Sequence, residues 1–155
     1  MPITRRTDYA VRMMYELAQL PPGTTLSIKD VSEVADIPES FGFTIAAFLV
    51  ESSLVAATGF RNHLLSLARP AKEITMDEII YACEPEFSLS TCVRDPLSCK
   101  RSSHCGVHAM WVSLDTIIIE HLRSMTLAEV AQNNSISADL LNSRAIARSV
   151  KSATC

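Results

Sequence analysis

The hydrophobic positions in the first third of the chain recur at helical spacing. Apolar side chains three and four positions apart predict a helix over residues 8–20 with one buried face. A second helix is expected from Ser27, because Ser27 and Asp30 have the spacing of a capping box. Pro38 suits the first turn of a third helix, which is expected to run to about Ser52.

The pattern then changes from helical to extended. Short apolar runs over residues 54–58 and 63–68 flank the segment GFRN and predict a β-hairpin. A further helix is expected over residues 75–83, because this segment opens with the capping-box pattern T-x-x-E.

The last part of the chain contains one long helical pattern. Residues 85–106 show little periodicity and hold three cysteines, so we expect a loop there. Residues 107–125 return to helical spacing, with an apolar stripe too broad for a lone surface helix. A short helix is expected over residues 127–131 after a third capping box, and the Ser-, Asn- and Ala-rich tail from Gln132 is expected to be mobile.

This order of elements predicts a winged helix-turn-helix domain with a long dimerisation helix, a mainly α fold with a small β-hairpin wing. In the third helix, Phe41, Ile45 and Leu49 fit core positions. The other apolar residues of that helix are expected on its surface, namely Phe43, Ala46, Ala47, Phe48 and Val50. The expected parts are a DNA-binding domain over residues 1–84 and a cysteine loop over residues 85–106. A dimerisation helix with the short terminal helix is expected over residues 107–131, followed by the tail over residues 132–155.

Composition narrows the class of protein. With 155 residues, 48% hydrophobic and 20% charged, the chain can build one domain with a real core. No stretch approaches the ~20 uncharged apolar residues that span a bilayer, and the N-terminus lacks the apolar run of a signal peptide, so we expect a cytoplasmic protein without membrane contact. A net charge of −3 argues against histone-like DNA binding but leaves room for a local basic patch.

The cysteines point to metal or redox chemistry. Five cysteines are an odd number for a disulfide framework. Cys92, Cys99, Cys105 and His108 form a C-x6-C-x5-C-x2-H array, whose thiolates and imidazole suit an iron–sulfur cluster or zinc. Structural zinc sites commonly use shorter C-x2–4-C spacings, so the long gaps favour the cluster. Cys83 fits a core position, and no catalytic triad or phosphate-binding glycine loop indicates an enzyme.

Cations lie between these predicted ligands. Arg94, Lys100 and Arg101 would stabilise a [2Fe–2S] cluster, whose formal charge with three thiolates and a neutral imidazole is about −1 when it is oxidised. A zinc site stays open as an alternative at this point.

Six segments in one order carry a family resemblance over residues 1–131. They are ITRRTDYAVRMMYELAQLP, LSIKDVSEVADIPESF, ARPAKEITMDEIIYAC, the three-cysteine loop, GVHAMW and RSMTLAEV. Together they resemble the iron–sulfur-cluster regulators related to IscR and NsrR, which are dimeric winged-helix transcription factors of bacteria. The resemblance implies a regulator that binds double-stranded DNA as a homodimer.

The resemblance implies two alternative clusters. In IscR-like members, the positions of Cys92, Cys99, Cys105 and His108 bind a [2Fe–2S] cluster. In NsrR-like members, an acidic residue at the position of Asp8, contributed by the partner subunit, completes a [4Fe–4S] cluster. This chain has both His108 and Asp8, and its C-x6-C gap is one residue longer than the usual family spacing. The [2Fe–2S] cluster with His108 is favoured, and the [4Fe–4S] cluster stays open.

The expected DNA-binding surface departs from the family. The candidate phosphate contacts are Arg5, Arg6, Lys29 and Arg61, with Arg12 in addition, and the candidate base contacts are Ser40 and Thr44. Between Lys29 and Arg61 lie five acidic residues and no basic one, which opposes phosphate binding. The apolar surface of the third helix is of a kind that more often binds protein than DNA.

The leading hypothesis is therefore a dimeric transcriptional regulator that senses iron–sulfur, redox or nitric oxide status through a bound cluster and binds a DNA operator. One alternative is a cluster-sensing protein whose third helix binds a protein partner. The other is a zinc-stabilised winged-helix protein.

Overall fold

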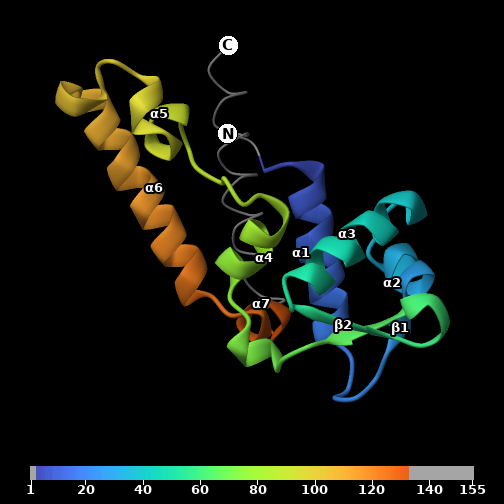
Figure 1. Cartoon of the computed structure of the whole chain (residues 1–155). Coiled ribbons are helices and arrows are strands. Elements are labelled where there is room, and N and C mark those ends of the chain that lie inside the picture. The colour runs from blue at the N-terminus through green and yellow to red at the C-terminus, as the bar shows by residue number, and fades with distance from the viewer. Residues whose placement is uncertain (1–2, 133–155) are drawn as a thin grey trace, which may run out of the picture.

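The computed structural model describes residues 3–132 (Figure 1). The mobile tail was expected from Gln132, which the structure places in a helix, and residues 133–155 lie outside the described residues. The helices and strands are α1 (Arg5–Ala18), β1 (Leu26–Ser27), α2 (Ile28–Val34), α3 (Glu39–Glu51), β2 (Val55–Thr58), β3 (Leu64–Leu67), α4 (Met76–Cys83), α5 (Thr91–Arg94), α6 (Gly106–Ser124) and α7 (Leu127–Gln132). The predicted fold class, mainly α with a small β-wing, is confirmed.

Local capping sets where the first helices begin. α1 begins at Arg5, three residues earlier than predicted, because the Thr4 hydroxyl accepts a hydrogen bond from the backbone N–H of Thr7 (3.3 Å). α2 begins after Ser27, as the capping pattern predicted, and the Ser27 hydroxyl accepts from the backbone N–H of Asp30 (3.1 Å).

The wing is part of a three-stranded antiparallel sheet in the order β1-β3-β2. The predicted hairpin is present as β2 and β3, with Val55 opposite Leu67 and Thr58 opposite Leu64. Gly59 opens the turn with φ +79°, a left-handed conformation that suits glycine. β1 was missed, because a strand of two residues has no alternating pattern to detect. We call the part formed by α1–α3 and the sheet, residues 5–67, the head.

The core of the head lies between α1, α2, α3 and the sheet. It contains the predicted face of α1 and the buried faces of the neighbouring elements, including Ala10, Met13, Met14, Leu17, Val31, Ile45, Leu49, Leu54 and Leu65. The α3 prediction was wrong at three positions. Phe41 is 46% exposed and not in the core, whereas Ala46 is buried and Phe48 is half-buried.

The rotation of α3 about its axis explains these differences. Gly42 faces α2 in close contact with Ser32, which turns Ile45, Ala46 and Leu49 inward. Phe41 is left at the edge of α3, where its ring packs edge-on against Tyr9 at 5.8 Å between centroids.

Replacing Gly42 by alanine is expected to lower the free energy of unfolding by about 1–3 kcal/mol. An added Cβ would lie 2.0 Å from Ser32 Oγ and 3.2 Å from its Cβ, so the Ser32 side chain and its packing between α2 and α3 would have to shift. Urea unfolding measures the effect. Adding Ser32→Ala should recover much of the loss, because the closest clashing atom is removed. Gly106→Ala is the matched control, since no described atom lies within 4 Å of a Cβ there. An unchanged unfolding midpoint in Gly42→Ala would contradict this packing.

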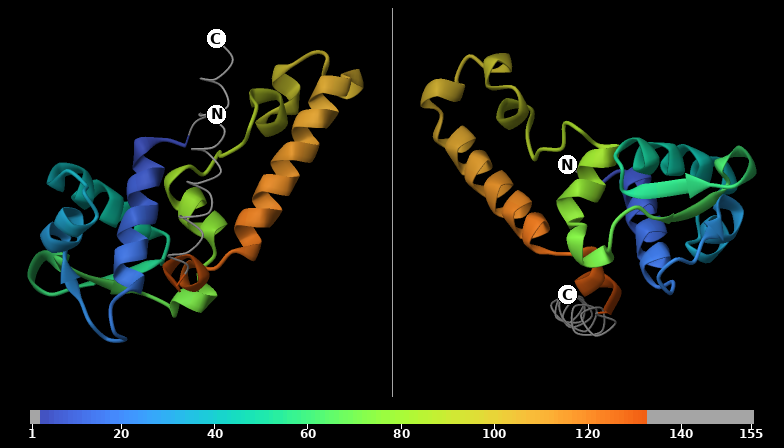
Figure 2. Two further views of the ribbon diagram at one scale, coloured as in Figure 1. Left: turned by 180° about the vertical axis from the view of Figure 1, so that it is seen from behind. Right: turned by 60° about the horizontal axis from the view of Figure 1, so that its bottom comes forward.

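α6 stands apart from the head, with α4 between them (Figure 1, Figure 2). Two polar contacts hold it in place. The buried Asp115 carboxylate accepts a hydrogen bond from the backbone N–H of Leu89 (2.7 Å), and Arg123 pairs with Asp77 on α4 (3.1 Å). The far side of α6 exposes an apolar stripe, which we define as Val107, Met110, Leu114 and Ile117. In the part of the chain that the structure describes, no helix is both long and apolar enough to cross a membrane.

Candidate cluster loop and DNA-binding surface

The three loop cysteines lie on short helical turns around the N-terminal end of α6, so the segment is more ordered than the sequence pattern indicated. Cys92 is on α5, Cys99 follows a 3-10 turn, and Cys105 is the N-cap residue of α6. All three thiols are half-buried and free. The loop is therefore held at the end of α6 and is reached from the solvent.

Two of the four predicted ligands are in contact. Nδ1 of His108 lies 3.4 Å from Sγ of Cys92, and the hydroxyl of Ser90 lies 3.2 Å from the same sulfur. His108 reaches Cys92 because it sits in the first turn of α6, directly beside α5.

The local environment of Cys105 favours its thiolate form. Hydrogen bonds from the backbone N–H groups of His108 and Val107 lower the pKa of the Cys105 thiol, with the charge of Arg101 adding to the effect. By contrast, burial raises the pKa of the Cys83 thiol to about 11, and its buried position confirms Cys83 as a core residue.

The donor set suits an iron–sulfur cluster or zinc, but the ligands are only partly brought together. Within residues 3–132, no three His, Cys, Asp or Glu side chains are gathered into one metal-binding group. The contact joins Cys92 and His108, while Cys99 and Cys105 belong to the same loop without joining that pair. The chemistry of three free, half-buried thiols and one imidazole fits a soft-metal group, and the roles of these residues stay a prediction.

Asp8 belongs to a different part of the molecule. It is on α1 in the head, where its carboxylate pairs with Arg12 four residues later (2.9 Å). A role for Asp8 as a ligand stays a prediction that requires the partner subunit.

A buried clamp, missed by the sequence analysis, joins α1 to the start of the cysteine loop. The carboxylate of Glu84, at the end of α4, accepts hydrogen bonds from the hydroxyls of Thr4 (2.6 Å) and Thr7. Burial alone would raise the pKa of Glu84, but these hydrogen bonds and the charge of Arg6 outweigh it and lower that pKa below its ordinary value. No local pattern signals this clamp, because its two sides are 80 residues apart.

Replacing Thr7 by valine is expected to lower the free energy of unfolding by about 1.5–3 kcal/mol at neutral pH, since the variant loses a buried hydrogen bond to a charged group. The lowered pKa of Glu84 means that its stabilisation is full above the ordinary glutamate pKa and is lost as pH falls through the folded value. The difference between the variant and the parent should therefore shrink below about pH 4. Denaturant unfolding across pH measures it, with the exposed Thr25→Val as control. A pH-independent difference would contradict the clamp.

The candidate DNA contacts lie on the head. Arg5, Lys29 and Arg61 are exposed, and so are Ser40 and Thr44 on α3. Arg6 is half-buried, with its guanidinium 5.1 Å above the ring of Phe48, so its position favours packing over phosphate contact. These contacts stay predictions.

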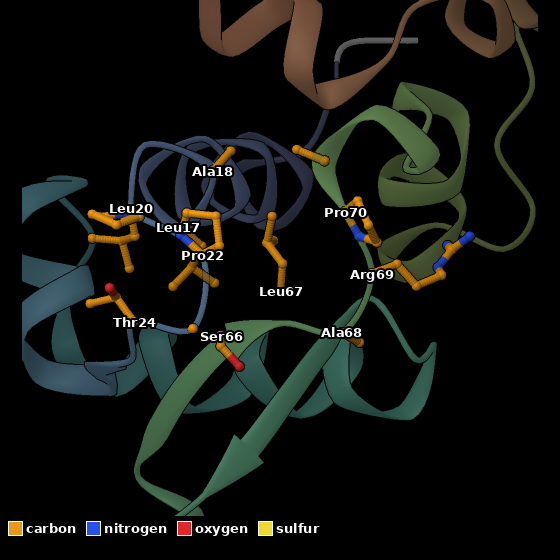
Figure 3. A pocket seen from close by; sticks show the side chains of 13 residues that line it. Leu17, Ala18, Leu20, Pro22, Thr24, Ser66, Leu67, Ala68, Arg69 and Pro70 are labelled. Carbon is orange, nitrogen blue, oxygen red and sulfur yellow. The ribbon is translucent and has the colours of Figure 1, made fainter.

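A pocket of about 460 Å³ lies at the surface of the head, between the end of α1, the Pro21–Gly23 turn and β3 (Figure 3). Leu17, Pro22 and Leu67 line it. None of the predicted site residues lies among its lining, so the pocket is separate from both candidate sites.

Comparisons with known proteins identify the family. The model of the Rrf2 family, whose description is "Iron-dependent Transcriptional regulator", matches residues 3–133. Protein aau3 of Rhizobium meliloti (strain 1021) is 29% identical over 134 residues, which make up 85% of this chain and 86% of that protein.

Solved structures share the fold. IscR of T. potens has a TM-score of 0.70 and 21% identity, with 88% of this chain and 90% of that chain covered. CymR (YrzC), the global cysteine regulator of B. subtilis, has a TM-score of 0.71 and 20% identity, with 87% and 99% covered. These likenesses show the winged-helix fold, and the family match covers all of the described residues. The chain therefore belongs to the Rrf2 family, a family of transcriptional regulators rather than enzymes.

Proposed function

We propose that the protein regulates transcription as a homodimer that binds operator DNA through its heads and holds an iron–sulfur cluster in the loop between residues 92 and 108. The observation that carries this proposal is the 3.4 Å contact between Cys92 and His108 beside α6, with two more free thiols in the same loop. The iron dependence in the description of the family supports the same ligand class.

The loop residues have the chemistry that such a cluster requires. Cys92, Cys99 and Cys105 supply thiolates, and His108 supplies the fourth donor from the first turn of α6. Lys100 and Arg101 are exposed in the same loop and would offset the negative charge of the thiolates. When bound, the cluster supplies a group that iron shortage, oxidants or nitric oxide can remove.

A continuous set of contacts links this loop to the head. Leu89 of the loop is bonded to Asp115 of α6, and Arg123 of α6 is paired with Asp77 of α4. The Glu84 clamp then joins α4 to α1. In the proposed dimer, the exposed apolar stripe of α6 forms the interface. Ordering or disordering of the loop would therefore alter how the two heads are spaced on DNA.

The ligand class is tested by metal and sulfide content. We expect protein purified without air to contain about two iron and two acid-labile sulfide atoms per chain and to absorb visible light. Zinc without sulfide would overturn the proposal in favour of a zinc-stabilised protein. A content of about four iron and four sulfide atoms per chain would indicate the [4Fe–4S] cluster instead.

The fourth ligand is tested by two alanine variants. His108→Ala is expected to lower the iron content and the visible absorbance more than Asp8→Ala, because His108 contacts Cys92 directly while Asp8 is paired with Arg12 in the head. Both are measured on protein purified without air. The reverse ranking would transfer the fourth ligand to Asp8 of the partner subunit.

A further inference from the structure

The outward face of α3 lacks the side chains that usually read purines. None of the 13 residues of α3 is Lys, Arg, His, Asn or Gln. In the major groove, guanine is read by bidentate Arg or Lys, and adenine by bidentate Asn or Gln. α3 therefore cannot supply either of these hydrogen-bonding patterns.

The centre of this face is formed by small side chains. Ile45 and Leu49 are buried, and the helical period places Ser40, Thr44 and Ala47 on the opposite side, where all three are exposed. Thr44 and Ala47 are three positions apart and therefore neighbours on that surface. They present two methyl groups and one hydroxyl. In the major groove, the apolar feature that such groups can contact is the 5-methyl group of thymine.

Two larger apolar side chains of α3, Phe41 and Phe43, contact other parts of the head and stay 46% and 42% exposed. The ring of Phe43 packs edge-on against His63 of the wing, 5.4 Å between centroids, and Phe41 packs against Tyr9. Protein-docking surfaces depend on large anchors such as aromatic residues, which here are partly used inside the chain. At the centre of the face, Thr44 and Ala47 are suited in size to single methyl groups, and the exposed Glu51 lies one turn further along the same side of α3.

Basic residues border the same face. The backbone N–H of Ile28 donates to the carbonyl of His63 (2.9 Å), and His63 contacts Phe43, so the start of α2, the wing and α3 lie side by side. Lys29 follows Ile28 on α2, and Arg61 precedes His63 by two residues with its guanidinium over the ring of Phe60. Both are exposed, and we expect them to contact phosphates that flank a major groove.

We propose that α3 recognises DNA by apolar contact of Thr44 and Ala47 with thymine methyl groups rather than by hydrogen bonds to purines. This inference rests on the proposed function, because it requires that the head binds duplex DNA. It predicts that each half-site of the operator contains a thymine whose methyl group, in the major groove, faces Thr44 and Ala47.

The test uses duplexes selected from a random pool of about 30 base pairs by cluster-loaded protein purified without air. Each thymine of the selected half-site is then replaced by deoxyuridine, which deletes the methyl group and keeps the base pair. We expect affinity to fall about four-fold for each contacted methyl group, and roughly sixteen-fold when both half-sites are changed. Deoxyuridine placed outside the base pairs that the bound protein covers is expected to leave the affinity unchanged.

A protein variant assigns the contact to α3. Thr44→Ser removes one methyl group and keeps the hydroxyl, so it should weaken binding to the thymine duplex and reduce the penalty for deoxyuridine. Thr116→Ser makes the same chemical change at an exposed position of α6, outside the head, and should leave that penalty unchanged.

Two other outcomes are distinguishable. Equal affinity for thymine and deoxyuridine duplexes, with sequence preference intact, would overturn the methyl-reading inference alone and leave α3 open to a protein partner. Failure of the pool to yield any preferred sequence at about 50 mM salt would overturn the proposed function and the inference together.

Discussion

Protein carrying Cys92→Ser is expected to lose its iron, its acid-labile sulfide and its visible absorbance while remaining folded. The sulfur of Cys92 is the atom that joins α5 to His108, so its removal takes away one ligand and the contact that positions another. A serine hydroxyl is a poor substitute, since iron–sulfur clusters are held by thiolates. The loop lies outside the core of the head, so the thermal unfolding of the head should change little.

Cys83→Ala is the matched control for this experiment. Cys83 is buried on α4, and its raised pKa keeps it a neutral thiol, so its replacement should leave iron content and spectrum unchanged. Full iron and sulfide in the Cys92→Ser protein would contradict the assignment of the loop as the cluster site.

Ile117→Glu is expected to convert a dimer into monomers. The apolar stripe of α6 includes Val107 and Ile117, which are 59% and 58% exposed in the single chain. An interface of standard size, about 1,600 Å², would cover such a stripe, and a buried unpaired carboxylate within it would cost several kcal/mol. Sedimentation velocity should then give a species of half the parent mass.

The control for the dimer experiment lies on the same helix. Thr116→Glu adds the same charge at an exposed position on the other side of α6, and that variant should remain dimeric. Ile118 and Ile119 are half-buried against the rest of the chain, so charges there would disturb the fold as well as association. A dimeric Ile117→Glu protein would show that association does not use this stripe.

Sequence patterns correctly predicted the elements that are set by interactions between residues close together in the chain. The apolar period of α1 and the caps at Ser27 and Thr75 are set by residues within a few positions of one another, and all are present. The rotation of α3 depends instead on Gly42 meeting Ser32 on another helix, so Phe41 and Ala46 were placed on the wrong sides. Spacing along one helix cannot reveal which neighbour comes closest.

The same distinction applies to the candidate sites. The cysteine array could be recognised because its members lie close together in the sequence, and the Cys92–His108 contact agrees with it. The convergence of all four donors does not follow from spacing, because it depends on the turns between them. The clamp of Thr4, Thr7 and Glu84 was missed, since Thr and Glu at such separation form no pattern.

The most direct test of the account is the affinity for one selected duplex before and after removal of the cluster. Fluorescence anisotropy would be recorded without air on cluster-loaded protein, and again after the iron has been chelated from the same preparation. Because Leu89 of the loop is hydrogen-bonded to Asp115 of α6, the helix proposed to form the dimer interface, we expect removal to weaken binding at least about ten-fold. Equal affinity of the two forms, with the dimer intact in both, would contradict the claim that the loop controls DNA binding.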